Sequence, residues 1–189
     1  TFAARIHKEA QRMIALVSDI LQLSELDSTQ ASHSREPVTE MAPVDLAALV
    51  KETAQNMTVN ARRAYVTLQY DARPATVRGS RDQLSELTQN LCDNAIRYNR
   101  PGGKVQIITA CSRDGHCSLT VTDNGIGIPR EAQASVFERF YRVDKSRGKA
   151  TGGTGLGLAI VKHIAALHGA NISLQSEVGN GTVILITFP

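Results

Sequence analysis

The amino-acid sequence predicts a two-layer α/β domain, in which helices cover one face of a mixed β-sheet, preceded by one long bundle helix. The first observation is a helical repeat of apolar residues over positions 2–28. The second is that helical and strand periodicity alternate from Val38 onward. The third is that most neighbouring strand segments are joined by short turns, such as Gly179-Asn180-Gly181, which favour hairpins and therefore a mixed sheet.

Residues 2–28 are expected to form one helix that does not pack on its own domain. A heptad seam runs along it, formed by Ile6, Ala10, Met13, Val17, Ile20, Ser24 and Asp27. Since a single helix this apolar is not stable alone in water, we expect it to belong to a helix bundle, and packing on its own domain is the alternative. Polar residues 28–36 are typical of a linker. We therefore divide the chain into a helical segment, 1–31, and a second domain, 32–189.

The second domain is expected to contain three helices and several strands. Two helices begin behind the capping side chains of Asp45 and Ser80 and end near Arg62 and Tyr98. A third covers Thr154–His168 and is closed by Gly169. The expected strands are Val66–Asp71, Ala75–Arg78, Lys104–Ser112, His116–Thr122, Ile172–Ser176 and Thr182–Phe188.

Composition argues against two classes of function. The formal net charge is +3 and aromatic residues make up 4%, without the basic stripe and stacking aromatics of a nucleic-acid-binding protein. No apolar run approaches the roughly 20 residues that cross a bilayer, so no membrane contact is expected. Because Thr1 is not a natural start, we expect a piece of a longer protein, and a membrane anchor upstream stays open.

The three cysteines form neither a paired framework nor a metal-binding spacing, which suits a reducing cytoplasm. If Asp114-Gly115 forms a two-residue hairpin turn, Cys111 lies opposite Ser118 rather than Cys117. We therefore expect a cytoplasmic domain without a disulfide at this hairpin.

The segment Asp123–Pro129 is the first candidate site. A strand ends in the carboxylate of Asp123, and two glycines, Gly125 and Gly127, then let the backbone pass close to a ligand. The chain does not return as a second strand, because Pro129–Ala132 has the composition of a helix start. A flat ligand whose exocyclic amine donates to Asp123 fits this pattern. A plain Asn-Gly hairpin turn is the alternative.

A polar stripe on the preceding helix is the second candidate. Asn90, Asn94 and Arg97 recur at i, i+4 and i+7, and therefore share one face at the rim of the core. The two amides can offer oxygens to a hard cation, and the guanidinium can donate to a phosphate. Alternatively, the amides satisfy local backbone groups.

The glycine-rich run from Gly152 to Leu158 is the third candidate. It opens a helix, so it presents free backbone N–H groups and the positive end of the helix dipole to an anion. It lacks the features of a dinucleotide-binding fingerprint or of a P-loop. Upstream, basic residues are expected to form a mobile lid over Phe137–Gly153, namely Arg139, Arg142, Lys145, Arg147 and Lys149.

In this order, the motifs resemble those of sensor histidine kinases, with an overall likeness to the phosphate-sensing branch. Residues 90–98 resemble the N box, 123–129 the G1 box, 137–144 the F box, 153–158 the G2 box and 179–182 the last glycine motif. The resemblance covers about residues 38–189. The first helix is similar to the second helix of the dimerisation and phosphotransfer domain.

The resemblance implies an α/β sandwich of the Bergerat (GHKL) type that binds ATP with Mg²⁺ under a lid. It implies that Asp123 accepts from the adenine amine and that Thr182 assists through its hydroxyl or a water. The metal ligands it implies are Asn90 and Asn94, and the catalytic residues are Asn94, Arg97 and Arg142. The remaining residues expected at the nucleotide are Tyr98, Gly125, Gly127, Ile128, Tyr141, Thr154, Gly155, Leu156, Gly157 and Leu158.

The implied function is transfer of the γ-phosphoryl of ATP to a histidine of the dimerisation domain in its own homodimer, and from there to a response regulator. The acceptor motif, a histidine followed by an acid and Arg-x-Pro, is absent, because His7 is followed by Lys8 and has no proline nearby. We therefore expect this chain not to phosphorylate itself. The alternatives are another ATPase or serine kinase of the same superfamily, or a regulatory module that binds ATP and transfers nothing.

Overall fold

The computed structural model describes residues 41–143 and 154–189, together with Met13. The expected first helix apart from Met13, the linker and the central part of the expected lid lie outside the described residues. Along the described chain the elements are β1 (Ala42–Asp45), α2 (Leu46–Arg63), β2 (Thr67–Ala72), β3 (Thr76–Gly79), α3 (Arg81–Arg97), β4 (Lys104–Cys111), β5 (Cys117–Asp123), a 3₁₀ turn (Arg130–Ala132), α5 (Gly157–Leu167), β6 (Asn171–Glu177) and β7 (Gly181–Thr187).

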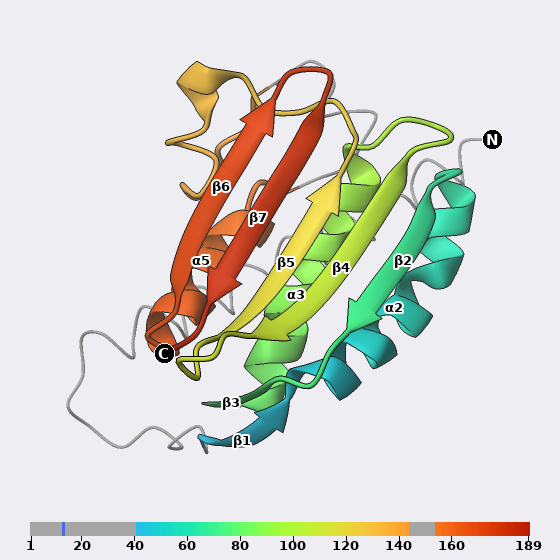
Figure 1. Cartoon of the computed structure of the whole chain (residues 1–189). Coiled ribbons are helices and arrows are strands. Elements are labelled where there is room, and N and C mark those ends of the chain that lie inside the picture. Colours follow the sequence, from blue (N-terminus) through green and yellow to red (C-terminus); the bar gives the residue numbers. More distant parts are fainter. Residues whose placement is uncertain (1–12, 14–40, 144–153) are drawn as a thin grey trace.

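The predicted two-layer arrangement is confirmed. Five strands form one sheet in the order β2-β4-β5-β7-β6, in which β2 and β4 are parallel and the other neighbours are antiparallel. Helices α2, α3 and α5 cover one face of this sheet (Figure 1). A small antiparallel pair, β1 with β3, lies beside it, and β1 was not predicted. None of the helices in the described ranges combines the length and apolar character that a membrane span requires.

Local capping explains where the helices begin. Asp45 Oδ1 accepts from the backbone nitrogens of Ala47 and Ala48 at 2.9 and 3.2 Å, and Ser80 Oγ accepts from Gln83 N at 3.5 Å. Both predicted N-caps are therefore confirmed. Helix α5 begins at Gly157 rather than at Thr154. The reason is the left-handed backbone at the intervening Gly155, with φ of +78°, which a continuous helix does not tolerate.

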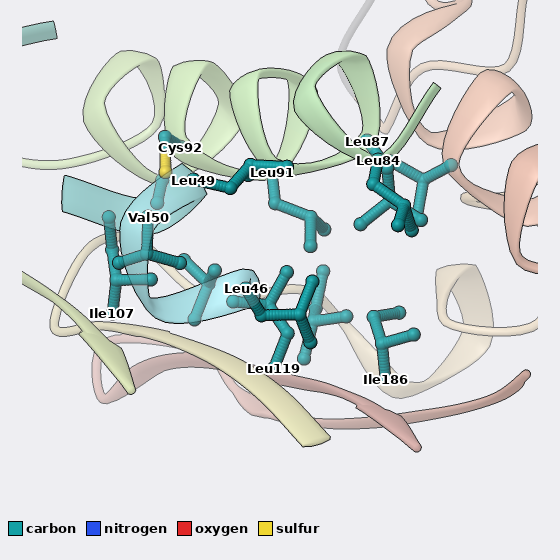
Figure 2. Packing of buried hydrophobic residues seen from close by; sticks show 14 of the residues in the cluster. Leu46, Leu49, Val50, Leu84, Leu87, Leu91, Cys92, Ile107, Leu119 and Ile186 are labelled. Carbon is teal, nitrogen blue, oxygen red and sulfur yellow. The ribbon is translucent and has the colours of Figure 1, made fainter. Parts of the chain in front are cut away.

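The core lies between the helices and the inner face of the sheet. Helix α3 contributes an apolar stripe, in which Leu84, Leu87 and Leu91 are at most 1% exposed. These leucines face Leu46 of α2 and Ile186 of β7, together with Leu49, Val50, Ile107 and Leu119 (Figure 2). Burying each leucine contributes on the order of 2 kcal/mol. The rotation of α3 is thereby fixed, and its polar stripe is held at the rim of the core.

The β4–β5 hairpin corrects the prediction about its cysteines. Cys111 pairs with Cys117, and the two are joined by a disulfide. The loop contains three residues rather than two, because Ser112 N donates to His116 O at 2.8 Å. Gly115 supplies the left-handed residue that such a loop requires, with φ of +87°. The extra loop residue shifts the register by one, so the expectation of Cys111 opposite Ser118 was wrong.

Candidate functional site

Three oxygen-bearing side chains form one row across neighbouring strands. Asp123 at the end of β5 pairs with Thr182 of β7, and Thr182 pairs with Ser176 of β6. Because residues directly opposite one another share a face of a sheet, all three lie on the side that the helices cover. Asp123 follows the buried Val121 by two residues, and Thr182 is 9% exposed. The strand-terminal carboxylate singled out in the sequence therefore lies in a protected polar corner.

The environment of Asp123 changes its acidity. Burial raises the pKa of the Asp123 carboxyl above its ordinary value, because desolvation disfavours the charged form. The backbone N–H groups of Gly125 and Thr182 donate to the carboxylate and partly oppose this rise in pKa. Gly125 N lies 2.8 Å from Oδ1. An ionised carboxylate has about four acceptor positions, so capacity remains for a donor from a ligand.

The loop after Asp123 is anchored on two sides. Ile126 N donates to Tyr98 O at the end of α3 (3.1 Å), and Gly179 N of the β6–β7 turn donates to Ile126 O (2.8 Å). Gly127 approaches the Glu177 carbonyl so closely that a Cβ would collide with it. The chain that leaves β5 thus crosses to the β6–β7 turn instead of pairing back on β5 (Figure 1). The alternative of a plain hairpin turn is wrong.

Two residues that the sequence did not single out hold this loop. Ser176 Oγ accepts from Ile128 N at 2.8 Å. Gln133 Nε2 donates to Ile128 O at 3.0 Å and to Ser176 O at 2.8 Å. Neither residue belongs to one of the sequence motifs, because Ser176 bonds a loop 48 positions away and Gln133 bonds Ser176, 43 positions away, as well as the nearby Ile128. Ser176 is recognised as part of the site only because the sheet places it in one row with Thr182 and Asp123.

The polar stripe of α3 meets the start of α5. A Cβ on Gly157 would lie 3.1 Å from Asn90 Oδ1 and 3.5 Å from Asn94 Nδ2. Within the described part of the chain, neither amide side chain makes a hydrogen bond, so they do not serve local backbone groups. The free N–H groups and the positive dipole end of α5 therefore lie beside two available amides, an arrangement that suits an anion with a hard cation.

The predicted guanidinium groups differ in their surroundings. Arg97 Nη2 lies 2.6 Å from Asp93 Oδ2, one turn earlier on α3. Its other N–H groups make no hydrogen bond within the described chain. Arg142 Nε is buried and has no hydrogen-bond partner among the described residues. Arg142 follows Phe140, whose backbone N donates to Gly155 O at 3.0 Å, so the F-box segment lies against the glycine turn before α5.

The remaining predicted residues differ in how much of each is available to a ligand. Leu156 is fully buried and Leu158 packs against the core, so their side chains face inward and only their backbone is available to a ligand. Leu156 N donates to Thr154 Oγ1 at 3.3 Å. Tyr98 is 39% exposed at the end of α3, and Tyr141 is partly buried. The lid residues from Asp144 to Gly153 lie outside the described residues.

A metal could be held here only with few protein ligands. No group of three or more His, Cys, Asp or Glu side chains that could hold an ion occurs in the described ranges. Magnesium is typically bound by one or two protein oxygens together with substrate phosphates and waters. The two amide oxygens of Asn90 and Asn94, beside an anion-binding helix start, fit that pattern.

The chain belongs to the family of histidine kinase-, DNA gyrase B- and HSP90-like ATPases (HATPase_c), which matches residues 79–189. It is therefore an ATP-binding domain, and its relatives place it among histidine kinase catalytic domains.

The sensor-like histidine kinase SenX3 of Mycolicibacterium smegmatis is 38% identical over 189 residues, which is 100% of this chain and 47% of the relative. Sensor histidine kinase WalK of Bacillus subtilis is 37% identical over 182 residues, covering 96% of this chain and 29% of WalK. The chain thus spans less than half the length of these curated relatives.

Solved structures agree with this assignment. The mycobacterial sensor histidine kinase MprB has 32% sequence identity and a TM-score of 0.68, over 79% of this chain and 97% of that one. The full-length ShkA structure in complex with AMPPNP has a TM-score of 0.80 over 100% of this chain and 38% of that one. Its 24% sequence identity shows a shared fold alone.

Proposed function

We propose that this domain binds Mg²⁺-ATP between the loop after β5 and the start of α5, and donates the γ-phosphoryl to a histidine on a separate helical domain. One observation carries the proposal. A protected carboxylate that can accept from a base lies at one end of α3, and two available amides beside a helix start lie further along the same helix. The first arrangement suits an adenine, and the second suits a metal-bound triphosphate.

At the base end, Asp123 accepts from the exocyclic amine of adenine, and Thr182 stands beside it in the row. The loop between Gly125 and Ile128 forms the edge of the pocket and is fixed by its bonds to Tyr98, Gly179 and Ser176. Binding is favoured because these groups are already in place before the nucleotide arrives.

At the phosphate end, the chain positions the triphosphate and neutralises its charge. Asn90 and Asn94 hold the magnesium ion, which when bound draws negative charge from the phosphates. The backbone N–H groups at the start of α5 donate to phosphate oxygens. Arg97 exchanges its bond to Asp93 for the phosphate, and Arg142 approaches the γ-phosphate from the lid. Positioning and charge neutralisation are the main contributions that a protein makes to phosphoryl transfer.

The partners follow from the proposed reaction. The acceptor is a histidine in the phosphotransfer domain of the same dimer, and a response regulator receives the phosphoryl group next. Residues 1–31 are the end of that dimerisation domain and residues 32–189 are the catalytic domain. The parent protein acts as a homodimer whose catalytic part lies in the cytoplasm, where ATP is supplied. SenX3 and WalK are named as histidine kinases, and their similarity supports this proposal.

Label transfer from ATP tests the proposal. The 189-residue chain is incubated with labelled ATP, Mg²⁺ and a separately supplied phosphoacceptor domain of SenX3. Label should appear on the acceptor, and Asn94→Ala should abolish both transfer and the Mg²⁺-dependence of ATP binding. Asn171→Ala is the matched control, because Asn171 is exposed at the opposite end of β6 and pairs with Thr187. ATP binding with no transfer to the acceptor would instead support a regulatory module.

A further inference from the structure

The hydroxyl group of Ser176 makes three contacts at once. Ser176 Oγ accepts from Ile128 N at 2.8 Å. It donates to Gly181 O at 2.8 Å. It also lies 2.8 Å from Thr182 Oγ1, in a contact where either oxygen can be the donor. Ser176 therefore links the loop after β5 to the side chain that stands next to Asp123.

The number of protons decides the direction of the third contact. A serine hydroxyl has one proton and two acceptor positions. Gly181 O can only accept, so the arrangement that satisfies every contact places the Ser176 proton on that bond. Ile128 N–H occupies one acceptor position of Ser176 Oγ, and the hydroxyl proton of Thr182 takes the other. Thr182 then points its proton away from Asp123 and leaves only lone pairs toward the pocket.

We infer that Ser176 is a positioning residue that fixes the orientation of the Thr182 hydroxyl. Asp123 and Thr182 then offer only acceptors to the base, and the site selects a 6-aminopurine over a 6-oxopurine. This inference rests on the proposed nucleotide site and adds the residue that sets its base selectivity. An exocyclic amine has two N–H donors and satisfies both Asp123 and Thr182. A 6-oxo group places an acceptor against two acceptors and is rejected, because buried groups are left unpaired.

The surroundings keep Ser176 in place. Gln133 uses both protons of its amide, on Ile128 O at 3.0 Å and on Ser176 O at 2.8 Å. The backbone pairing of Ser176 with Thr182 also holds the two side chains opposite each other. The hydroxyl geometry is thus supported from the loop and from the sheet.

Titration of the 189-residue chain with Mg²⁺-ADP and Mg²⁺-IDP tests the inference, since the two bases differ only in the groups at positions 6 and 1. In the unchanged protein ADP should bind more tightly. In Ser176→Ala the Thr182 hydroxyl is free to turn and donate to the 6-oxo group. The ratio of the two Kd values should then fall by about fivefold or more, the lower bound for one mismatched buried hydrogen bond.

Three variants separate selectivity from folding. Ser176→Thr keeps a hydroxyl and should restore the ratio. Ser173→Ala removes an exposed serine of the same strand, on the opposite face, and should leave the ratio unchanged. In Thr182→Val, a further Ser176→Ala change should not alter the ratio, because no hydroxyl is left to turn.

The outcomes are distinct. Equal weakening of ADP and IDP binding in Ser176→Ala, or an unchanged ratio, would overturn the inference and leave the proposed site intact. Failure of the unchanged protein to bind ADP would refute the site itself. If Ser176→Ala does not fold, Thr182→Val decides alone. If Thr182→Val weakens the binding of ADP more than that of IDP, Thr182 acts as an acceptor and the inference is supported. If it weakens the binding of IDP more, Thr182 acts as a donor and the inference is overturned.

Discussion

Replacing Asp123 by asparagine changes only one heavy atom of the pocket floor and keeps its shape. Gly125 N donates to Oδ1 at 2.8 Å, so the single oxygen of the new amide is required at that position. The NH₂ group must then take the place of the other carboxylate oxygen. It would point a donor at the amine of adenine, which is also a donor. The cost of such a buried mismatch is about 1–3 kcal/mol, which corresponds to a roughly 5- to 150-fold weaker Kd for ADP.

Folding should not suffer from this substitution. Burial raises the pKa of Asp123 above its value in the unfolded chain. A carboxyl of this kind stabilises the fold below its unfolded pKa, and that contribution is lost as the pH rises through the folded pKa. At neutral pH the empty protein therefore holds a desolvated charge, which the neutral amide removes. This gain opposes the weakening of the Thr182 N–H bond to the side chain, so the free energy of unfolding of Asp123→Asn should stay close to that of the unchanged protein.

Calorimetric titration with Mg²⁺-ADP and urea unfolding at neutral pH measure these two effects. Asp114→Asn is the matched control, since Asp114 is exposed in the β4–β5 turn, and both quantities should stay unchanged there. Equal ADP affinity in Asp123→Asn and in the unchanged protein would refute the placement of the base at Asp123. A large loss of stability would show that the affinity change reflects folding instead.

Four further outcomes are expected. The affinity for ADP should fall with decreasing pH, beginning above the range of an ordinary aspartate because the pKa of Asp123 is raised, and Asp123→Asn should lack this contribution to the fall in parallel titrations. The chain incubated alone with labelled ATP should stay unlabelled, and acid-labile phosphate on His7 would contradict the assignment of the first helix. His168→Ala should lower the free energy of unfolding by about 2–4 kcal/mol, because the buried imidazole accepts from the backbone N–H of Ser80 and also bonds Ile164 O of α5. Urea unfolding measures this loss, and Lys162→Ala, a change at an exposed residue of α5, should leave the free energy of unfolding nearly unchanged. Thiol alkylation of the denatured, unreduced chain should modify Cys92 alone, and all three cysteines after reduction; three free thiols before reduction would contradict the β4–β5 disulfide.

Local features of this fold could be predicted from the sequence because they depend on neighbouring residues. Helix caps at Asp45 and Ser80 require only a side chain within three positions of the N–H that it accepts. The Asn90–Asn94 stripe and the leucine stripe of α3 follow from helical periodicity. Six expected strands are present with ends within two residues of those observed. For the same reason the order of the nucleotide motifs was sufficient to indicate the family.

Distant pairings were decided by the tertiary structure. The strand β1 was not predicted, and its only sheet partner in the described chain is β3, more than thirty positions away. One additional residue in the β4–β5 loop moved Cys111 opposite Cys117, because the register of a hairpin depends on the backbone of its turn. Arg97 is paired with Asp93, a choice between partners that spacing alone does not settle.

The surroundings of Asp123 show most clearly what the sequence determined and what the structure added. Asp123 was recognisable because its role depends on the glycines that directly follow it. Ser176 and Gln133 were not, because Ser176 bonds Ile128, 48 positions away, and Gln133 bonds Ser176, 43 positions away. Their hydrogen bonds exist only once β6, β7 and β5 are aligned in the sheet. The sequence therefore determined which chemistry this protein carries, and the register of its strands determined which side chains hold that chemistry in place.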